Sequence, residues 1–127
     1  MVAERDGVVV GYAHASLHRA RPAYRWSVEV SVYLAPAERG RGTGRALYQV
    51  LLGQVRDLGY VTAFAGVTLP NPASVALHER LGFRPVGIFE AVGFKHGRWH
   101  DVGWWRLPLV DPPPEHPADP RPWRPAP

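Results

Sequence analysis

The most regular pattern in the chain is an alternation of apolar and polar positions over residues 28–34. Valine or leucine occupies every second position of this run, and Glu29, Ser31 and Tyr33 stand between them. A period of two is typical of a β-strand with one face against a core and the other toward solvent. The run therefore predicts a central strand whose polar face can carry functional groups.

A second pattern, with helical spacing, follows a short interval later. Pro36 removes a backbone donor and can end the strand, and residues 39–45 then form a loop rich in arginine and glycine. Apolar residues beyond this loop recur three or four positions apart, which predicts a helix that stops at Gly59. These residues are Leu47, Val50, Leu51, Val55 and Leu58.

A shorter helix is delimited by its end signals. Asn71 is a typical N-cap, Pro72 suits the first helical position, and Gly82 can take the left-handed conformation that ends a helix. Asp6-Gly7 is a strong hairpin signal between the first two of five further strand-like runs. These runs span residues 1–5, 8–17, 60–68, 84–92 and 99–109.

Composition narrows the class of protein. The 127 residues amount to about one domain, and the eight prolines in residues 111–127 predict a disordered tail after a domain of residues 1–110. Cysteine is absent, which excludes disulfides and cysteine metal sites. No apolar run approaches the roughly 20 residues of a membrane span and the first residues do not resemble a signal peptide, so we expect a cytoplasmic protein without a membrane partner.

The positive charge raises the question of nucleic acid. The formal net charge is +4, and 14 of the 15 basic residues are arginine. The arginines are nevertheless spread along the chain, apart from the group in residues 39–45, and aromatic and basic residues do not interleave as they do in RNA-binding modules. We therefore expect a small anionic ligand and no nucleic acid partner.

The arginine-glycine loop has the chemistry of a phosphate site. At the start of a helix the first amides are unpaired and the helix dipole favours negative charge. Glycines let the backbone approach oxygen atoms closely, and arginines add bidentate donors. The loop lacks the lysine of a Walker motif and the glycine spacing of the dinucleotide fingerprint. The alternative is an ordinary surface loop rich in arginine.

Three segments carry a resemblance to a known family. The order Arg39-x-x-Gly42-x-Gly44 after a strand resembles the coenzyme A pyrophosphate loop of GNAT acyltransferases. The segment NPASVALHERLGF resembles the second acetyl-CoA motif of that family. Together with YRWSVEVSVYL and GFKHGRWHDVGWW, these motifs are similar to the phosphinothricin N-acetyltransferase branch, and the likeness extends from Met1 to about Leu109.

The resemblance implies a fold and a reaction. The expected fold is an α/β domain of the α+β type, with a mixed, mostly antiparallel sheet and flanking helices. The expected reaction is direct acetyl transfer from acetyl-CoA, without a metal, to the amino group of a small amino acid or analogue such as phosphinothricin, methionine sulfoximine or methionine sulfone. Members of the family are often dimers, so a homodimer is the expected assembly.

Two residues are candidates for proton transfer. Glu29 is the acid within a strand of valines, where partial burial would suit a general base; the alternative is a solvent-facing acid. His78 stands where the family commonly has its tyrosine acid, and this branch places histidine there. A protonated imidazole could donate to a departing thiolate, whereas the alternative is a helix histidine satisfied by its neighbours.

The resemblance also implies binding residues. Those expected to hold the cofactor are the backbone of Val32, Tyr33 and Leu34, the loop residues Gly40, Arg41, Gly42, Thr43, Gly44 and Arg45, and the side chain of Asn71. The substrate candidates are Arg19, Arg21 and Tyr33. The residues alone favour the alternative that Arg19 and Arg21 are ordinary solvent-exposed arginines in a polar connection.

GNAT domains normally begin with a further strand and two helices, so we expect an N-terminally truncated sequence. The alternative function is a truncated, non-catalytic acyl-CoA-binding domain.

Overall fold

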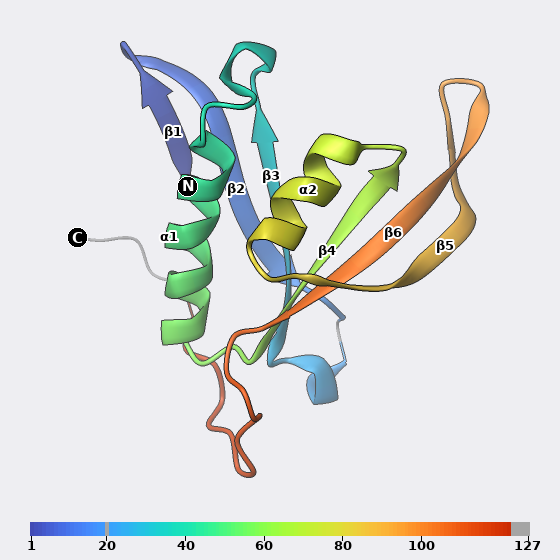
Figure 1. Cartoon of the computed structure of the whole chain (residues 1–127). Coiled ribbons are helices and arrows are strands. Elements are labelled where there is room, and N and C mark those ends of the chain that lie inside the picture. Colours follow the sequence, from blue (N-terminus) through green and yellow to red (C-terminus); the bar gives the residue numbers. More distant parts are fainter. Residues whose placement is uncertain (20, 123–127) are drawn as a thin grey trace.

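A computed structural model of the chain describes residues 1–19 and 21–122 as one six-stranded sheet with two α-helices (Figure 1). The strand order is β1-β2-β3-β4-β6-β5. All neighbours pair antiparallel except β3 and β4, which are parallel. The strands are β1 Val2–Arg5, β2 Val8–Leu17, β3 Ser27–Leu34, β4 Thr62–Leu69, β5 Arg84–Lys95 and β6 Arg98–Pro108.

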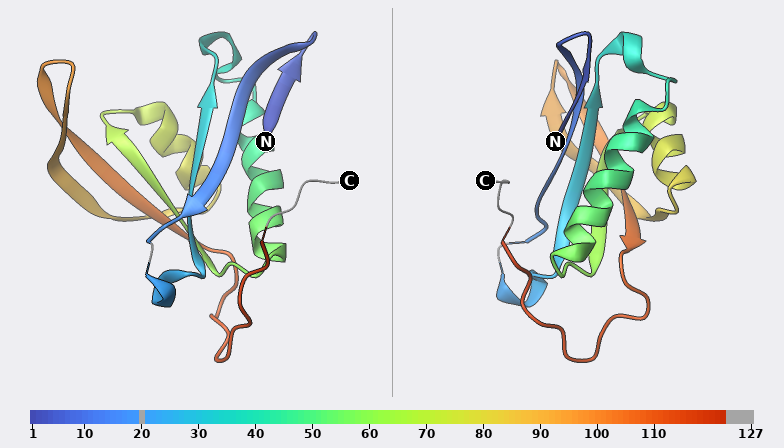
Figure 2. Two further views of the ribbon diagram at one scale, coloured as in Figure 1. Left: turned by 180° about the vertical axis from the view of Figure 1, so that it is seen from behind. Right: turned by 90° about the vertical axis from the view of Figure 1, so that its left-hand side faces the viewer.

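Both α-helices cover the same face of the sheet, as the edge-on view in Figure 2 shows. Helix α1 (Thr43–Asp57) forms the crossover between the parallel strands β3 and β4, and α2 (Pro72–Arg80) connects β4 to β5. Two short 3-10 helices, η1 (Pro22–Tyr24) and η2 (Pro36–Glu38), flank β3. The mixed, mostly antiparallel sheet with flanking helices confirms the predicted fold class.

The alternation in β3 has the predicted consequence. Val28 and Val30 are 3% and 2% exposed and belong to a core formed with α1 and β4, whereas Tyr33 on the opposite face is 54% exposed. Tyr48 on α1 is fully buried in this core. The polar face of β3 is therefore the face that no described helix covers.

The predicted helix ends are confirmed. Asn71 caps α2 by accepting a hydrogen bond from the Ser74 amide at 3.2 Å. Gly59 and Gly82 follow the two helices with φ angles of 105° and 97°, a left-handed conformation that glycine adopts without strain.

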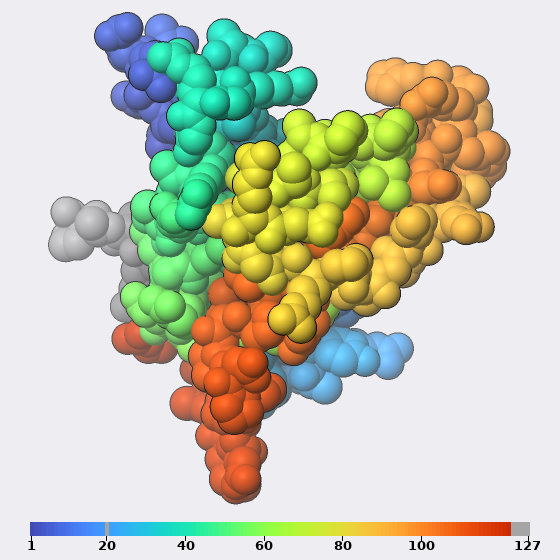
Figure 3. Space-filling view, viewed as in Figure 1, coloured from blue at the N-terminus to red at the C-terminus, as the bar shows by residue number. Residues whose placement is uncertain are grey.

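The last two strands are longer than predicted. The predicted runs leave residues 93–98 between them, but pairing continues through most of this interval as the β5–β6 hairpin. The turn needs only His96 and Gly97, whose φ angles of 53° and 76° are those of a tight hairpin turn. This hairpin projects from the body of the molecule (Figure 3).

The described part of the proline-rich tail, residues 111–122, contains no helix or strand. It returns to the start of β3 and the end of α1, where it makes hydrogen bonds. Trp26 Nε1 donates to the Ala118 carbonyl at 2.8 Å, and the Arg121 amide donates to the Leu58 carbonyl at 2.7 Å. Residues 123–127, part of the predicted disordered tail, lie outside the described residues. The division at residue 110 stays a prediction. Within the described residues, no helix is long and apolar enough to cross a membrane.

Candidate active site

Strands β3 and β4 separate and leave a V-shaped opening in the sheet. Their pairing covers three positions and ends at Glu29 and Phe64. Beyond this point the edge of β3 that faces β4 has no strand neighbour among the described residues, and α2 lies in front of the opening (Figure 1). Unpaired strand groups must find another partner, so an extended ligand could occupy this edge along the expected cofactor residues Val32, Tyr33 and Leu34.

The glycine loop stands at the open end of β3. Gly40 and Gly42 have φ angles of 78° and 82°, which a side chain would strain. Gly42 is the N-cap of α1, no side chain caps this end, and the first turn contains no acidic residue. The N-terminus of α1 therefore has the backbone arrangement that suits a phosphate.

Gly44 is needed for close packing. A Cβ atom at this position would lie 3.1 Å from Leu77 of α2 and 3.3 Å from Leu34 of β3. A larger residue would push the first turn of α1 away from both elements. This glycine therefore sets the distance between α1, α2 and β3 where the two helices flank the opening.

A buried carboxylate accepts hydrogen bonds from two residues of the loop and from β1. Glu38 is 2% exposed and accepts a bidentate pair of hydrogen bonds from Arg5 on β1, at 2.7 and 3.1 Å. It also accepts hydrogen bonds from the Thr43 hydroxyl at 2.8 Å and from Arg41 at 3.3 Å. The bonds from Arg5 and then Thr43 are the main causes that lower the pKa of Glu38 from its ordinary value of 4.5 to about 2.

The hydrogen bonds to Glu38 engage some of the polar side chains of the loop and leave others available to a ligand. The Thr43 hydroxyl donates a hydrogen bond to Glu38, and one guanidinium nitrogen of Arg41 does so as well. Arg39 and Arg45 are exposed and form no ion pair within residues 1–19 and 21–122. The charge available to an anion at the loop therefore comes first from Arg45 and Arg39.

Glu29 lies at the vertex of the opening. Its side chain is 34% exposed, and its Oε1 is 3.0 Å from Nδ1 of His18 at the end of β2. Leu34 is five positions beyond Glu29 on β3, a rise of roughly 16 Å. An extended ligand held at the loop would thus bring its far end close to this carboxylate.

Aromatic rings lie on the uncovered face of the sheet in both directions from Glu29. Toward the glycine loop, four positions along β3, Tyr33 stacks on Tyr12 with 4.9 Å between ring centroids. On the other side Phe64 stacks on His18 at 4.5 Å, and Trp104 lies over Gly66, where a Cβ atom would be 3.1 Å from the indole. Phe64, the β4 residue paired with Glu29, therefore gives this acid an aromatic neighbour across the opening.

His78 is in a different environment from the one its expected acid role requires. It is 3% exposed; its Nδ1 is 2.7 Å from the Ser74 carbonyl, and its Nε2 is 2.9 Å from the Tyr48 hydroxyl. Nδ1–H therefore donates to Ser74, and Nε2 accepts from Tyr48. Burial lowers the pKa of His78 and outweighs the effect of the Ser74 bond. A neutral, buried ring with both nitrogens engaged argues against an acid and favours the structural alternative.

The other expected binding residues are exposed. The Oδ1 atom of Asn71 is engaged in the cap of α2, which leaves its amide nitrogen to contact a ligand. Arg19 and Arg21 lie in the connection from β2 to η1, at the end of β3 opposite the glycine loop. The structure thus brings Glu29 and Tyr33 onto one face and leaves the two arginines at its margin.

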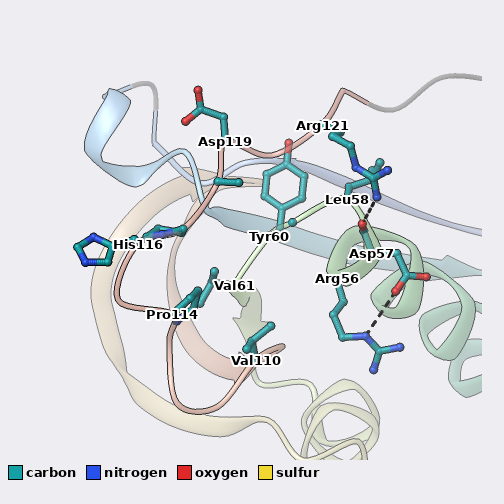
Figure 4. Close-up of a pocket in the computed structure, with 13 residues that line it drawn as sticks. Arg56, Asp57, Leu58, Tyr60, Val61, Val110, Pro114, His116, Asp119 and Arg121 are labelled. Atoms are coloured by element: carbon teal, nitrogen blue, oxygen red, sulfur yellow. Dashed lines mark hydrogen bonds and ion pairs between the residues drawn. The ribbon is translucent and has the colours of Figure 1, made fainter.

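A separate pocket of about 330 Å³ lies between the C-terminal end of α1 and the tail (Figure 4). Its polar groups largely pair with one another: Arg121 donates to the Asp57 carbonyl, and Arg56 lies 3.8 Å from the Asp57 carboxylate. None of the residues that line this pocket belongs to the glycine loop or to β3, so the pocket is not part of the candidate site.

Two residues with direct roles in this geometry have no local sequence signal. Glu38 meets Arg5 across 33 positions of sequence, and His18 meets Glu29 across 11. Both contacts depend on strand pairing. An antiparallel register between residues 8–17 and 27–34, had it been deduced, would have placed His18 diagonally beside Glu29.

Comparisons with known proteins identify the family of this chain. Residues 1–83 match the sequence profile of the Acetyltransferase (GNAT) family. The chain is 45% identical over 125 residues to a phosphinothricin N-acetyltransferase of Streptomyces viridochromogenes, covering 98% of this chain and 66% of that protein. It is 40% identical over 109 residues to an L-methionine sulfoximine/L-methionine sulfone acetyltransferase of Salmonella typhimurium, covering 86% of this chain and 64% of that protein.

Solved structures show the same fold. A phosphinothricin acetyltransferase of Sinorhizobium meliloti in complex with AcCoA superimposes with a TM-score of 0.86 at 44% identity, covering 93% of this chain and 64% of the other. An acetyltransferase from Salmonella typhimurium with its cofactor acetyl-CoA gives a TM-score of 0.84 at 38% identity, covering 91% and 66%. The chain thus spans slightly less than two thirds of the length of these relatives. The chain belongs to the GNAT family of acetyltransferases.

Proposed function

We propose that this protein is an N-acetyltransferase that transfers an acetyl group from acetyl-CoA to the amino group of a small amino acid or amino acid analogue. The observation that carries the proposal is the opening between β3 and β4, which has an uncapped helix N-terminus at one end and Glu29 at the other. Phosphinothricin, methionine sulfoximine and methionine sulfone are the first acceptors to test, because they occur in the names of the relatives.

The site fits coenzyme A in three respects. Gly40 and Gly42 give the loop its positive φ angles. The uncapped backbone amides at the start of α1, together with Arg45, suit the pyrophosphate. The unpaired edge of β3 suits the amide-bearing pantetheine arm, and the Asn71 amide nitrogen, at the start of α2, is a further donor proposed for it. When bound there, acetyl-CoA supplies the activated acetyl group as a thioester.

Glu29 is the proposed general base. An amino group is largely protonated at neutral pH, so the carboxylate takes one proton from the acceptor ammonium and frees its lone pair. The nitrogen then attacks the thioester carbonyl, a C–N bond forms, and the C–S bond breaks. His78 holds α1 to α2 in this scheme, because its ring nitrogens are already occupied. The thiolate therefore takes its proton from the reacting amine or from water.

The acceptor is proposed to approach from the uncovered face, beside Tyr33. Arg19 and Arg21, at the margin of that face, remain candidates for its carboxylate. A homodimer remains a proposal that light scattering on the purified protein would test.

Two measurements on one preparation test the function. Calorimetric titration with acetyl-CoA should show binding, and thiol release should then depend on one of the three named acceptors. Binding without release for any amine would select the non-catalytic acyl-CoA-binding alternative. Absence of binding would refute both functions, provided that circular dichroism shows a folded protein.

A further inference from the structure

We propose that His18 is a positioning residue for the general base: it holds one carboxylate oxygen of Glu29 and leaves the other directed to the acceptor amine. This inference depends on the proposed function, because it assigns a role within the same site. None of the family motifs in this chain includes His18, which lies in the connection between β2 and β3.

The contact follows from the strand register. Ser16 on β2 faces Glu29 on β3, and the His18 amide donates to the Ser27 carbonyl at 3.3 Å. His18 is therefore the diagonal neighbour of Glu29 on the same face, a separation that a ring can bridge. The 3.0 Å between Nδ1 and Oε1 is a hydrogen-bond distance, with Nδ1–H as the donor.

The imidazole is held from more than one side. Its ring stacks on Phe64 with 4.5 Å between centroids, and Trp104 meets it edge-on at 6.1 Å. The small side chain of Ser27 lies between β2 and β4 at this level and lets the two rings meet. With only 18% of its side chain exposed, His18 has little freedom to turn away from the carboxylate.

The carboxylate, by contrast, has a single partner. Within residues 1–19 and 21–122, the bond to His18 is the one side-chain hydrogen bond or ion pair of Glu29, and it involves Oε1. The other titratable or charged groups nearby on this face have different neighbours: His14 bonds Ser31, Tyr33 stacks on Tyr12, and Arg106 is exposed beyond Phe64. The second oxygen, Oε2, is therefore free to accept a proton.

The chemical consequence is a fixed direction for proton transfer. A hydrogen bond to one oxygen of a carboxylate fixes the orientation of the other oxygen. The proton moves from the acceptor nitrogen to Oε2, and no bond of His18 breaks. Loss of the Nδ1–H donor should thus slow turnover without weakening acetyl-CoA binding, because the cofactor loop lies roughly 16 Å away along β3.

Kinetics of four variants test the role. His18→Leu should lower kcat about 10- to 100-fold, the range for loss of a charge-assisted or orienting contact, with unchanged KM for acetyl-CoA. His18→Asn, whose amide can donate from the position of Nδ1, should recover most of the rate. In Glu29→Gln, adding His18→Leu should have little further effect. Full additivity of the two substitutions, or no rescue by asparagine, would overturn the proposal.

A measurement independent of turnover accompanies the kinetics. Long-range ¹H–¹⁵N NMR of the neutral imidazole should place the His18 proton on Nδ1, and Glu29→Leu should remove this preference. A proton on Nε2 in the unsubstituted protein would refute the proposal. If Glu29→Gln has full activity, the assignment of Glu29 as base fails; if Glu29→Gln is slow but His18→Leu is not, only the role of His18 fails.

Discussion

The two partly or fully buried acids of this molecule, Glu38 and Glu29, are near opposite ends of β3 and have opposite surroundings. Glu38 is 2% exposed, and both of its oxygens accept hydrogen bonds from Arg5, with Thr43 and Arg41 adding more. Glu29 is half-buried and has one hydrogen bond, from His18. A carboxylate with all its donors in place can only support structure, whereas one with a free oxygen can exchange a proton.

The difference also separates binding from chemistry. Glu38 fixes a loop whose backbone suits a phosphate, and Glu29 stands where the β3–β4 pairing ends. Substitutions at the two ends should therefore change different quantities. At the Glu38 end they should change cofactor affinity or stability, and at the Glu29 end they should change turnover.

The largest effect is expected at Glu29. Glu29→Gln keeps the shape of the side chain but removes the proton acceptor, so kcat/KM for the amine should fall about 10²- to 10⁴-fold. The affinity for acetyl-CoA, measured by calorimetry, should remain unchanged. Glu90→Gln, at an exposed position on the β5–β6 hairpin, is the control. Unchanged turnover in Glu29→Gln would remove the distinction between the two acids.

The next effect is expected in the loop. Gly42→Val forces a β-branched residue to a φ of 82°, which costs about 1–3 kcal/mol and should distort the N-terminus of α1. Acetyl-CoA binding should weaken at least about 10-fold. Gly53→Val is the matched control, because Gly53 also has open space around its Cβ position but lies within α1 without a positive φ. Equal affinities for the two variants would contradict the loop assignment.

A third prediction concerns the buried pair between α1 and α2. Tyr48→Phe leaves Nε2 of His78 without a donor in the core, so the free energy of unfolding should fall by about 1–3 kcal/mol. Urea unfolding measures this change, and Tyr24→Phe at an exposed position provides the control. If His78 has a structural role, kcat should change by less than about threefold; a large loss of kcat without loss of stability would restore the acid role.

The smallest effect is expected at Glu38 and depends on pH. Its pKa is about 2 in the folded protein and ordinarily 4.5, so its stabilising contribution is complete above about pH 4.5 and disappears as the pH falls toward 2. The difference in unfolding free energy between the unsubstituted protein and Glu38→Gln should therefore narrow over this range. Glu79→Gln, at an exposed position on α2, should show no such narrowing. A constant difference would mean that Glu38 is not held by its donors.

The elements of this fold could be predicted because each has a local physical cause. Alternation along residues 28–34 predicted β3, and Asn71 with Gly82 marked the ends of α2, as the structure confirms. The prediction was wrong for the length of the last hairpin. A two-residue turn at His96-Gly97 allows strand pairing to continue through most of residues 93–98, the interval between the two predicted runs.

The chain by itself determined the strand and helix periods, the caps and the glycine loop, because these depend on neighbours within a few residues. Only the tertiary structure decided which side chains meet. The separation of β3 from β4 created the opening, the pairing of β2 with β3 brought His18 to Glu29, and the packing of α1 against α2 enclosed His78. Contacts of this kind join residues far apart in sequence, so no local pattern encodes them.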